Sequence, residues 1–118
     1  MGFDILGLNE ENYFRNTSCW WIPLWDICYD VSKDSEFNEG INLNDYNGGT
    51  GNNGYTITEE KAIELNELLL EWIKDEEKVA KFIKEYPTKY GLKPDIFNLE
   101  NVKDFADFCL KSGGFEIH

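Results

Sequence analysis

The chain has 118 residues, of which 42% are hydrophobic and 15% are aromatic. This apolar content excludes an intrinsically disordered chain, and the length predicts a single domain, residues 1–118, with a core of its own. The formal net charge is −12, from 23 acids and 11 bases. Such an excess of negative charge argues against nucleic acid or an anionic membrane as a direct ligand, and favours a basic partner or simply high solubility.

The cysteine content and the start of the chain predict where the protein works. No apolar run approaches the ~18 residues of a membrane-spanning helix, and the opening segment MGFDILGLN lacks the basic residues of a secretion signal. Three cysteines, an odd number, in a chain without an export signal indicate reduced thiols. We therefore expect a cytoplasmic protein.

The first third of the chain is predicted to contain one strand and one helix. Gly2–Leu8 is expected to be a strand because Phe3 and Ile5 alternate with their neighbours. Glu10–Ser18 is expected to be a polar connection. A helix is predicted over about Pro23–Ser32, because proline fits the first turn of a helix and apolar residues follow at helical spacing. Its inner face is expected to hold Leu24, Ile27, Cys28 and Val31.

The middle of the chain combines a polar loop with a strong helix signal. Residues 38–54 are rich in glycine and asparagine and are predicted to form a flexible loop. Tyr55–Ile57 is expected to be a short extended piece. Thr58 is a suitable N-cap and is followed by two glutamates, which suit the positive end of a helix dipole, so a helix is predicted to run from there to about Lys74.

Two further helices are predicted before the last strand. The first covers about Glu76–Tyr86 and is expected to end at Pro87, because the residue before a proline disfavours helical geometry. The second covers about Leu99–Ser112, and Asn98 is expected to cap its N-terminus.

The two ends of the chain are expected to pair with each other. Gly113 suits the left-handed end of the last helix, and the alternation over Phe115–His118 predicts a strand. The predicted fold class is therefore α+β, with three to four helices packed on a small sheet formed mainly by the N- and C-terminal strands. At least one of Trp20 and Trp21 is expected to stay partly exposed. The predicted core contains Phe3, Ile5, Leu24, Ile27, Leu65, Leu69, Trp72, Phe82, Phe105, Cys109 and Ile117.

Negative charge is concentrated in the first half of the sequence. Residues 1–60 contain 11 acids and two bases, whereas residues 61–118 contain 12 acids and nine lysines. This asymmetry predicts an acidic face on the folded protein. The alternative is that the second half is helical and needs charges of both signs for pairing along its helices.

Two rows of carboxylates are candidate partner-binding sites. The first follows the end of the first helix into the loop and contains Asp26, Asp30, Asp34, Glu36, Glu39 and Asp45. The second lies opposite the apolar face of the helix that follows Thr58, extends toward Asp75, and contains Glu60, Glu64, Glu67 and Glu71. Four helical residues rise ~6 Å, and DNA carries one charge per ~3.4 Å on each strand, so these rows are similar to a phosphate track.

The alternative to a partner-binding row is an ordinary solvated helix face. In that case, neighbouring charges of opposite sign pair with each other, with Glu71 next to Lys74 and Glu77 next to Lys81.

No catalytic or metal motif stands out, and we expect neither a cofactor nor an enzymatic activity. Cys19, Cys28, Cys109 and His118 are the side chains that would make a four-ligand zinc site, but no two of them have the close spacing of structural zinc modules. Cys28 and Cys109 fall on predicted inner faces, which favours buried thiols over a Cys109–His118 dyad. Arg15, the sole arginine, is expected to pair with a nearby acid rather than to clamp an anion.

Three blocks carry a resemblance to a known group: MGFDILGLN at the start, YFRNTSCWWIPLWDIC next, and NVKDFADFCLKSGGFEI at the end. They resemble a group of small, uncharacterised phage- and prophage-encoded proteins. Ile22 precedes the proline where the pattern of that group has arginine. The resemblance implies a phage-like origin, and a small, strongly acidic phage protein is similar in kind to anti-CRISPR and other anti-defence inhibitors, several of which imitate DNA.

The sequence therefore leads to the hypothesis of a non-enzymatic, acidic inhibitor in the host bacterial cytoplasm. Its expected partner is a basic, nucleic-acid-handling defence protein, plausible examples being CRISPR effectors, and the two carboxylate rows are its expected binding residues. Two alternatives stay open. One is an immunity protein that neutralises a basic nuclease toxin, and the other is a small nucleotide- or metal-binding enzyme.

Overall fold

A computed structural model describes residues 2–9, 12–32, 55–89 and 98–118. The elements that they form are β1 (Gly2–Gly7), β2 (Tyr13–Thr17), α1 (Ser18–Ser32), β3 (Tyr55–Thr58), α4 (Glu59–Lys74), α5 (Glu76–Lys89), α6 (Leu99–Lys111) and β4 (Gly114–Ile117). The fold is α+β, as the sequence predicts. The loop predicted at 38–54 lies outside the described residues.

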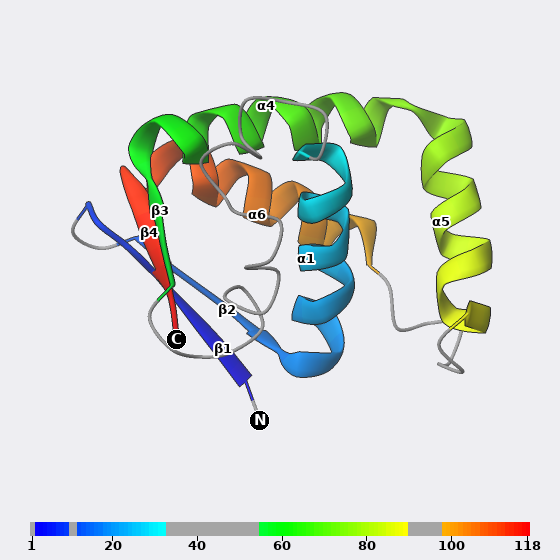
Figure 1. Ribbon diagram of the computed structural model, residues 1–118, viewed down its shortest axis with the longest axis horizontal. Helices are drawn as coiled ribbons and strands as arrows, with labels where there is room; N and C mark the ends of the chain where they lie inside the picture. The colour runs from blue at the N-terminus through cyan, green and yellow to red at the C-terminus, as the bar shows by residue number, and fades with distance from the viewer. Residues whose placement is uncertain (1, 10–11, 33–54, 90–97) are drawn as a thin grey trace.

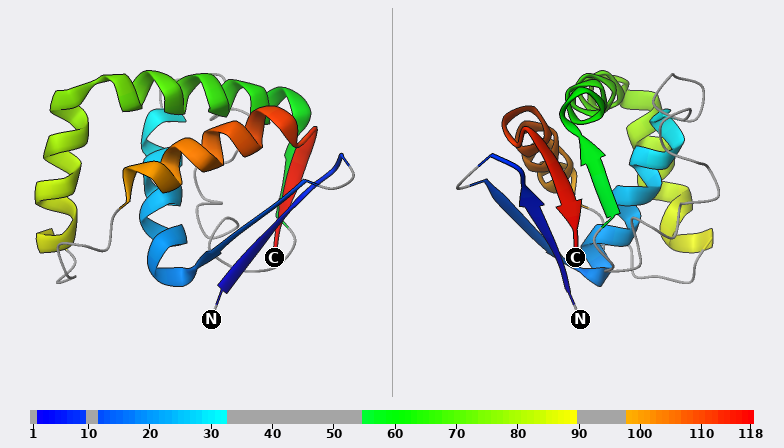
Figure 2. Two further views of the ribbon diagram at one scale, coloured as in Figure 1. Left: turned by 180° about the vertical axis from the view of Figure 1, so that it is seen from behind. Right: turned by 60° about the vertical axis from the view of Figure 1, so that its left-hand side comes forward.

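The strands form a four-stranded antiparallel sheet in the order β2-β1-β4-β3. The N- and C-terminal strands are its central pair, with Ile5 opposite Ile117, which confirms the predicted pairing of the chain ends. β3 adds to the other side of β4, where Ile57 lies opposite Phe115. The sheet lies at one end of the molecule, with α1, α4 and α6 on one side of it and α5 farthest away (Figures 1 and 2).

Aromatic side chains fill the space between the sheet and the helices. Trp21 of α1 stacks on Phe3 and on Trp25, and it makes a T-shaped contact with Phe105 of α6. Phe105 in turn contacts Phe115 of β4. These residues are all nearly or fully buried, and the predicted core is confirmed except that Phe82 is only partly buried. As expected, one of the paired tryptophans, Trp20, remains exposed.

Both predicted N-caps are confirmed. The Thr58 hydroxyl accepts a hydrogen bond from the Lys61 N–H at the start of α4, and the Asn98 side chain accepts one from the Glu100 N–H at the start of α6. At the end of α6, Gly113 has φ +71°, the left-handed conformation that the sequence predicts there. These local signals determine where α4 begins after β3 and where α6 begins and ends before β4.

One predicted connection is wrong, because the residues from Tyr13 to Thr17 form strand β2. Phe14 packs toward α6 against Phe105, whereas Tyr13 and Arg15 are exposed on the other face of the sheet. The alternation is present, but only one of its inward positions is apolar, since the other is Asn16. The pattern is therefore too polar to indicate a strand on its own.

Both predictions that used proline as a boundary are also wrong. α1 begins at Ser18, so Pro23 lies inside the helix, and α5 continues through Pro87 to Lys89. A proline removes one backbone hydrogen bond but has a φ that a helix accepts. In α1 this loss is offset by the burial of Trp21, Leu24 and Trp25.

Candidate functional site

The candidate site is a row of four carboxylates along α4. Three of them, Glu60, Glu67 and Glu71, are exposed, and Glu64 is half-buried. They follow the helix at spacings of four, three and four residues, so the row is about 16 Å long at ~1.5 Å per residue. The buried side of α4 holds Ala62, Leu65, Asn66, Leu69 and Trp72, so the row is on the opposite side, as the sequence predicts.

Among the described residues, these four carboxylates lack the ion pairs that several acids elsewhere form. Elsewhere, Asp75 pairs with Lys78, Glu100 with Lys103 and Asp107 with Lys111, as expected for neighbouring charges along a helix surface. Within the described part of the chain, none of the four α4 carboxylates forms an ion pair, and Glu71 does not pair with Lys74. The row therefore keeps its negative charge available to a partner.

Asp75, the last carboxylate in line with the α4 row, caps the junction between α4 and α5. It ends α4, and its side chain accepts a hydrogen bond from the Lys78 N–H at the start of α5. It is thus the residue around which the chain turns from one helix into the next (Figure 1).

The first predicted row is divided by the structure. Asp26 is half-buried, and its carboxylate accepts a hydrogen bond from the Tyr86 hydroxyl, which joins α1 to α5. Asp30 is exposed near the C-terminal end of α1, a helix that packs against α4. The other predicted members lie outside the described residues: Asp34, Glu36, Glu39 and Asp45. The α4 row is therefore the candidate that the structure presents as a continuous surface.

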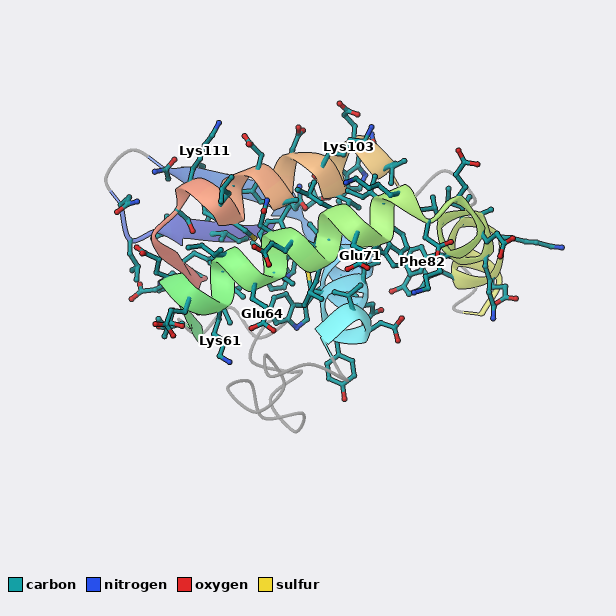
Figure 3. The ribbon with its side chains drawn as sticks, turned by 90° about the horizontal axis from the view of Figure 1, so that it is seen from above. Lys61, Glu64, Glu71, Phe82, Lys103 and Lys111 are labelled. Carbon is teal, nitrogen blue, oxygen red and sulfur yellow. The ribbon has the colours of Figure 1, made fainter. Side chains whose placement is uncertain are left out.

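Figure 3 looks down on α4 and shows how charged side chains are arranged along α4 and α6, which lie side by side. Glu64 and Glu71 lie on the edge of α4 that is turned away from α6, whereas Lys103 and Lys111 lie along α6. Both of these lysines have a carboxylate partner on their own helix. The edge of α4 is consequently more negative than the surface of α6.

The outer face of the sheet carries a smaller polar group that the sequence identified only in part. Arg15 Nε lies 3.7 Å from Asp4 Oδ1, which confirms the expected pairing of the sole arginine with an acid. The Tyr13 hydroxyl donates a hydrogen bond to the same carboxylate, and this bond raises the pKa of Tyr13. The contact follows from the β1–β2 register, which the sequence did not reveal.

Among the described side chains, Cys28, Cys109 and His118 do not form a reactive group, and the side chain of the fourth candidate zinc ligand, Cys19, lies outside the described residues. Cys28 and Cys109 are buried, and burial raises the pKa of both thiols well above its ordinary value. His118 is exposed, and its Nε2 lies 3.1 Å from Glu116 Oε2. Within the described ranges, no three His, Cys, Asp or Glu side chains are placed to hold a metal ion.

Buried thiols should be protected from reagents and should make stability depend on pH. In a Cys19→Ser background, the native chain is expected to react negligibly with Ellman's reagent, while the denatured chain shows both remaining thiols. The unfolded thiols ionise above about pH 8.5 and the folded ones do not, so the free energy of unfolding should fall by about 1.4 kcal/mol per pH unit per thiol above that pH. Rapid reaction of the native chain would contradict this burial.

Comparisons with known proteins leave the site to be interpreted from its own geometry. No protein-family model, curated protein or solved structure matches this chain. None of the described helices has the length and apolar character needed to cross a membrane.

Proposed function

We propose that this chain is a non-catalytic, acidic binding protein that acts in the bacterial cytoplasm and inhibits a basic, nucleic-acid-handling defence protein. The observation that carries the proposal is the row of Glu60, Glu64, Glu67 and Glu71, four carboxylates without a described ion-pair partner on one 16-residue helix. To a protein surface that binds nucleic acid, such a row presents a line of negative charges similar to that of a phosphate backbone.

Electrostatics of this kind would act mainly on encounter and specificity. Opposite charges on the two surfaces accelerate association, and salt weakens the effect because the Debye length falls to about 8 Å at physiological ionic strength. Exposed ion pairs contribute only about 0.2–1 kcal/mol each, so four of them account for part of a stable complex. Apolar contacts next to the row would have to supply the remainder.

A capture experiment tests the proposal. The immobilised chain is exposed to nuclease-treated bacterial lysate at low and high salt, each captured protein is identified and purified, and its binding to a labelled oligonucleotide is measured with and without the chain. We expect a basic nucleic-acid-binding protein whose oligonucleotide binding is inhibited and whose association with the chain slows as salt rises. Capture of no such protein, or of one whose nucleic-acid binding is unaffected, would contradict the proposal.

Substitutions on α4 test whether the row itself is responsible. Replacing Glu60, Glu64, Glu67 and Glu71 with glutamine is expected to weaken the affinity for the captured protein by about tenfold or more at low salt. A matched control variant also removes four negative charges, but at exposed positions outside the row: Glu76→Gln, Glu77→Gln, Glu85→Gln and Asp104→Asn. Its affinity should change by less than about threefold. Equal losses in both variants would mean that only net charge matters.

A further inference from the structure

α4 and α6 lie side by side and run in opposite directions. α4 begins directly after β3 and α6 ends directly before β4, and these two strands pair with Thr58 opposite Gly114. Near the middle of the helix pair, Asn66 Nδ2 donates a hydrogen bond to the Ala106 carbonyl oxygen at 2.6 Å. This bond identifies the side of each helix that is turned toward the other.

Apolar side chains on those same sides remain open to solvent. Ile63 and Leu70 lie three residues before and four residues after Asn66, so they share its side of α4, and Leu110 lies one turn after Ala106 on α6. Their exposed fractions are 37%, 42% and 52%. Because the helices are antiparallel, Ile63 and Leu110 are near the sheet end and Leu70 is about two turns farther along.

This surface, which we call the α4–α6 face, consists of Ile63, Leu70 and Leu110 with the adjacent carboxylate row. Glu67 lies between Ile63 and Leu70 along α4, at four and three residues from them. Together the two helices contain eight acids and four lysines, and two of the lysines are paired with acids on α6. The face thus combines three exposed apolar side chains with an α4 edge on which Glu64, Glu71 and one lysine, Lys61, lie (Figure 3).

The charge decides what kind of partner fits. A second copy of this chain would bring two negative surfaces together and is disfavoured. A basic element with one apolar side would cover the three exposed apolar residues and also meet the carboxylates. Two antiparallel helices accept a third helix along their shared surface at the usual interaxial distance of about 8–10 Å. An amphipathic basic helix satisfies all of these conditions.

We infer that the α4–α6 face binds an amphipathic basic helix of the partner, with apolar residues at i, i+3 or i+4, and i+7 seated on Ile63, Leu70 and Leu110. Its lysine or arginine side chains meet the α4 carboxylates. This inference rests on the proposed function and adds to it the part of the partner that is recognised. The spacing is that of helix recognition in other complexes, where apolar anchors one turn apart supply most of the affinity.

Two synthetic peptides test the inference directly. One is an 18-residue leucine–lysine peptide with its leucines on a single helical side, and the other has the same composition shuffled so that they share no side. Affinity is measured by fluorescence anisotropy, and the contact is mapped by amide chemical shifts on the unsubstituted chain. The first peptide is expected to bind at least tenfold more tightly and to shift resonances of α4 and α6. Equal binding of both peptides, or shifts elsewhere, would overturn the inference.

Variants of the chain separate this inference from the proposed function. Ile63→Ser with Leu70→Ser is expected to weaken binding of the first peptide, and of any captured protein, at least tenfold. The control is Leu6→Ser with Ile83→Ser, since these residues are 40% and 42% exposed on β1 and α5; it should change affinity by less than about twofold. If a captured protein binds the Ile63/Leu70 variant normally, the helix-binding inference fails and the proposed function stands. If no nucleic-acid-binding protein is captured, the proposed function itself fails.

Discussion

Replacing Phe115 with alanine is expected to lower the free energy of unfolding by about 3–5 kcal/mol. Phe115 is fully buried in β4, contacts Phe105 and Phe108 of α6, and lies opposite Ile57 in the sheet. Truncating a buried phenylalanine removes this contact area and leaves a cavity that the packed core fills only in part. Since domains of this size are stable by only about 5–15 kcal/mol, the loss is a large share of the total.

Urea unfolding followed by circular dichroism measures this effect. The neighbouring substitution Glu116→Ala is the control, because Glu116 is on the other face of β4 and is half-exposed; its free energy of unfolding should change by less than about 1 kcal/mol. Deleting residues 115–118 removes most of the strand between β1 and β3, so that chain is expected to be insoluble. A Phe115→Ala variant as stable as the control would show that β4 does not organise the core.

Much of the fold could be predicted because its signals are local. Thr58 and Asn98 act as helix caps, and the left-handed Gly113 ends α6, through interactions within a few residues of sequence. The pairing of β1 with β4 joins the two ends of the chain, yet it too could be predicted. Alternation predicts one short strand at each end, and the simplest arrangement pairs these two strands with each other.

The parts of the fold that could not be predicted depend on distant contacts. Strand β2 contains Asn16 at an inward position, where its side chain exchanges two hydrogen bonds with Asn101 of α6, 85 residues away. The helix around Pro23 is retained because its tryptophans are buried against residues from β1 and α6. In both cases tertiary packing outweighs a local preference that points the other way.

The candidate site shows the same division. The α4 row follows from helical periodicity alone, so Glu60, Glu64, Glu67 and Glu71 could be predicted. The role of Asp26 could not, because its partner Tyr86 is 60 residues away. Nor could the α4–α6 face, since Ile63 and Leu110 are brought to the same end of the helix pair only by the antiparallel packing of α4 and α6.

The buried amide pair between β2 and α6 leads to the second large effect. Asn16 and Asn101 each donate a hydrogen bond to the other's side-chain oxygen, both at 2.9 Å, and they are only 6% and 9% exposed. Asn16 Nδ2 also donates to the Arg15 carbonyl oxygen. Replacing either asparagine with leucine removes both mutual bonds and leaves the other amide buried without its partner, so each single variant should lose about 2–4 kcal/mol.

Changing both residues to leucine should cost much less than the sum of the two single losses. The double variant leaves neither member of the pair without its partner and places two apolar side chains of similar shape in contact, a replacement that can be nearly neutral. A double-mutant cycle measured by urea unfolding is expected to give a coupling of about 3 kcal/mol, the upper end of the range for residues in contact. Additive losses would show that the two amides act independently, and that Asn16 is tolerated in β2 for a reason other than its pairing with α6.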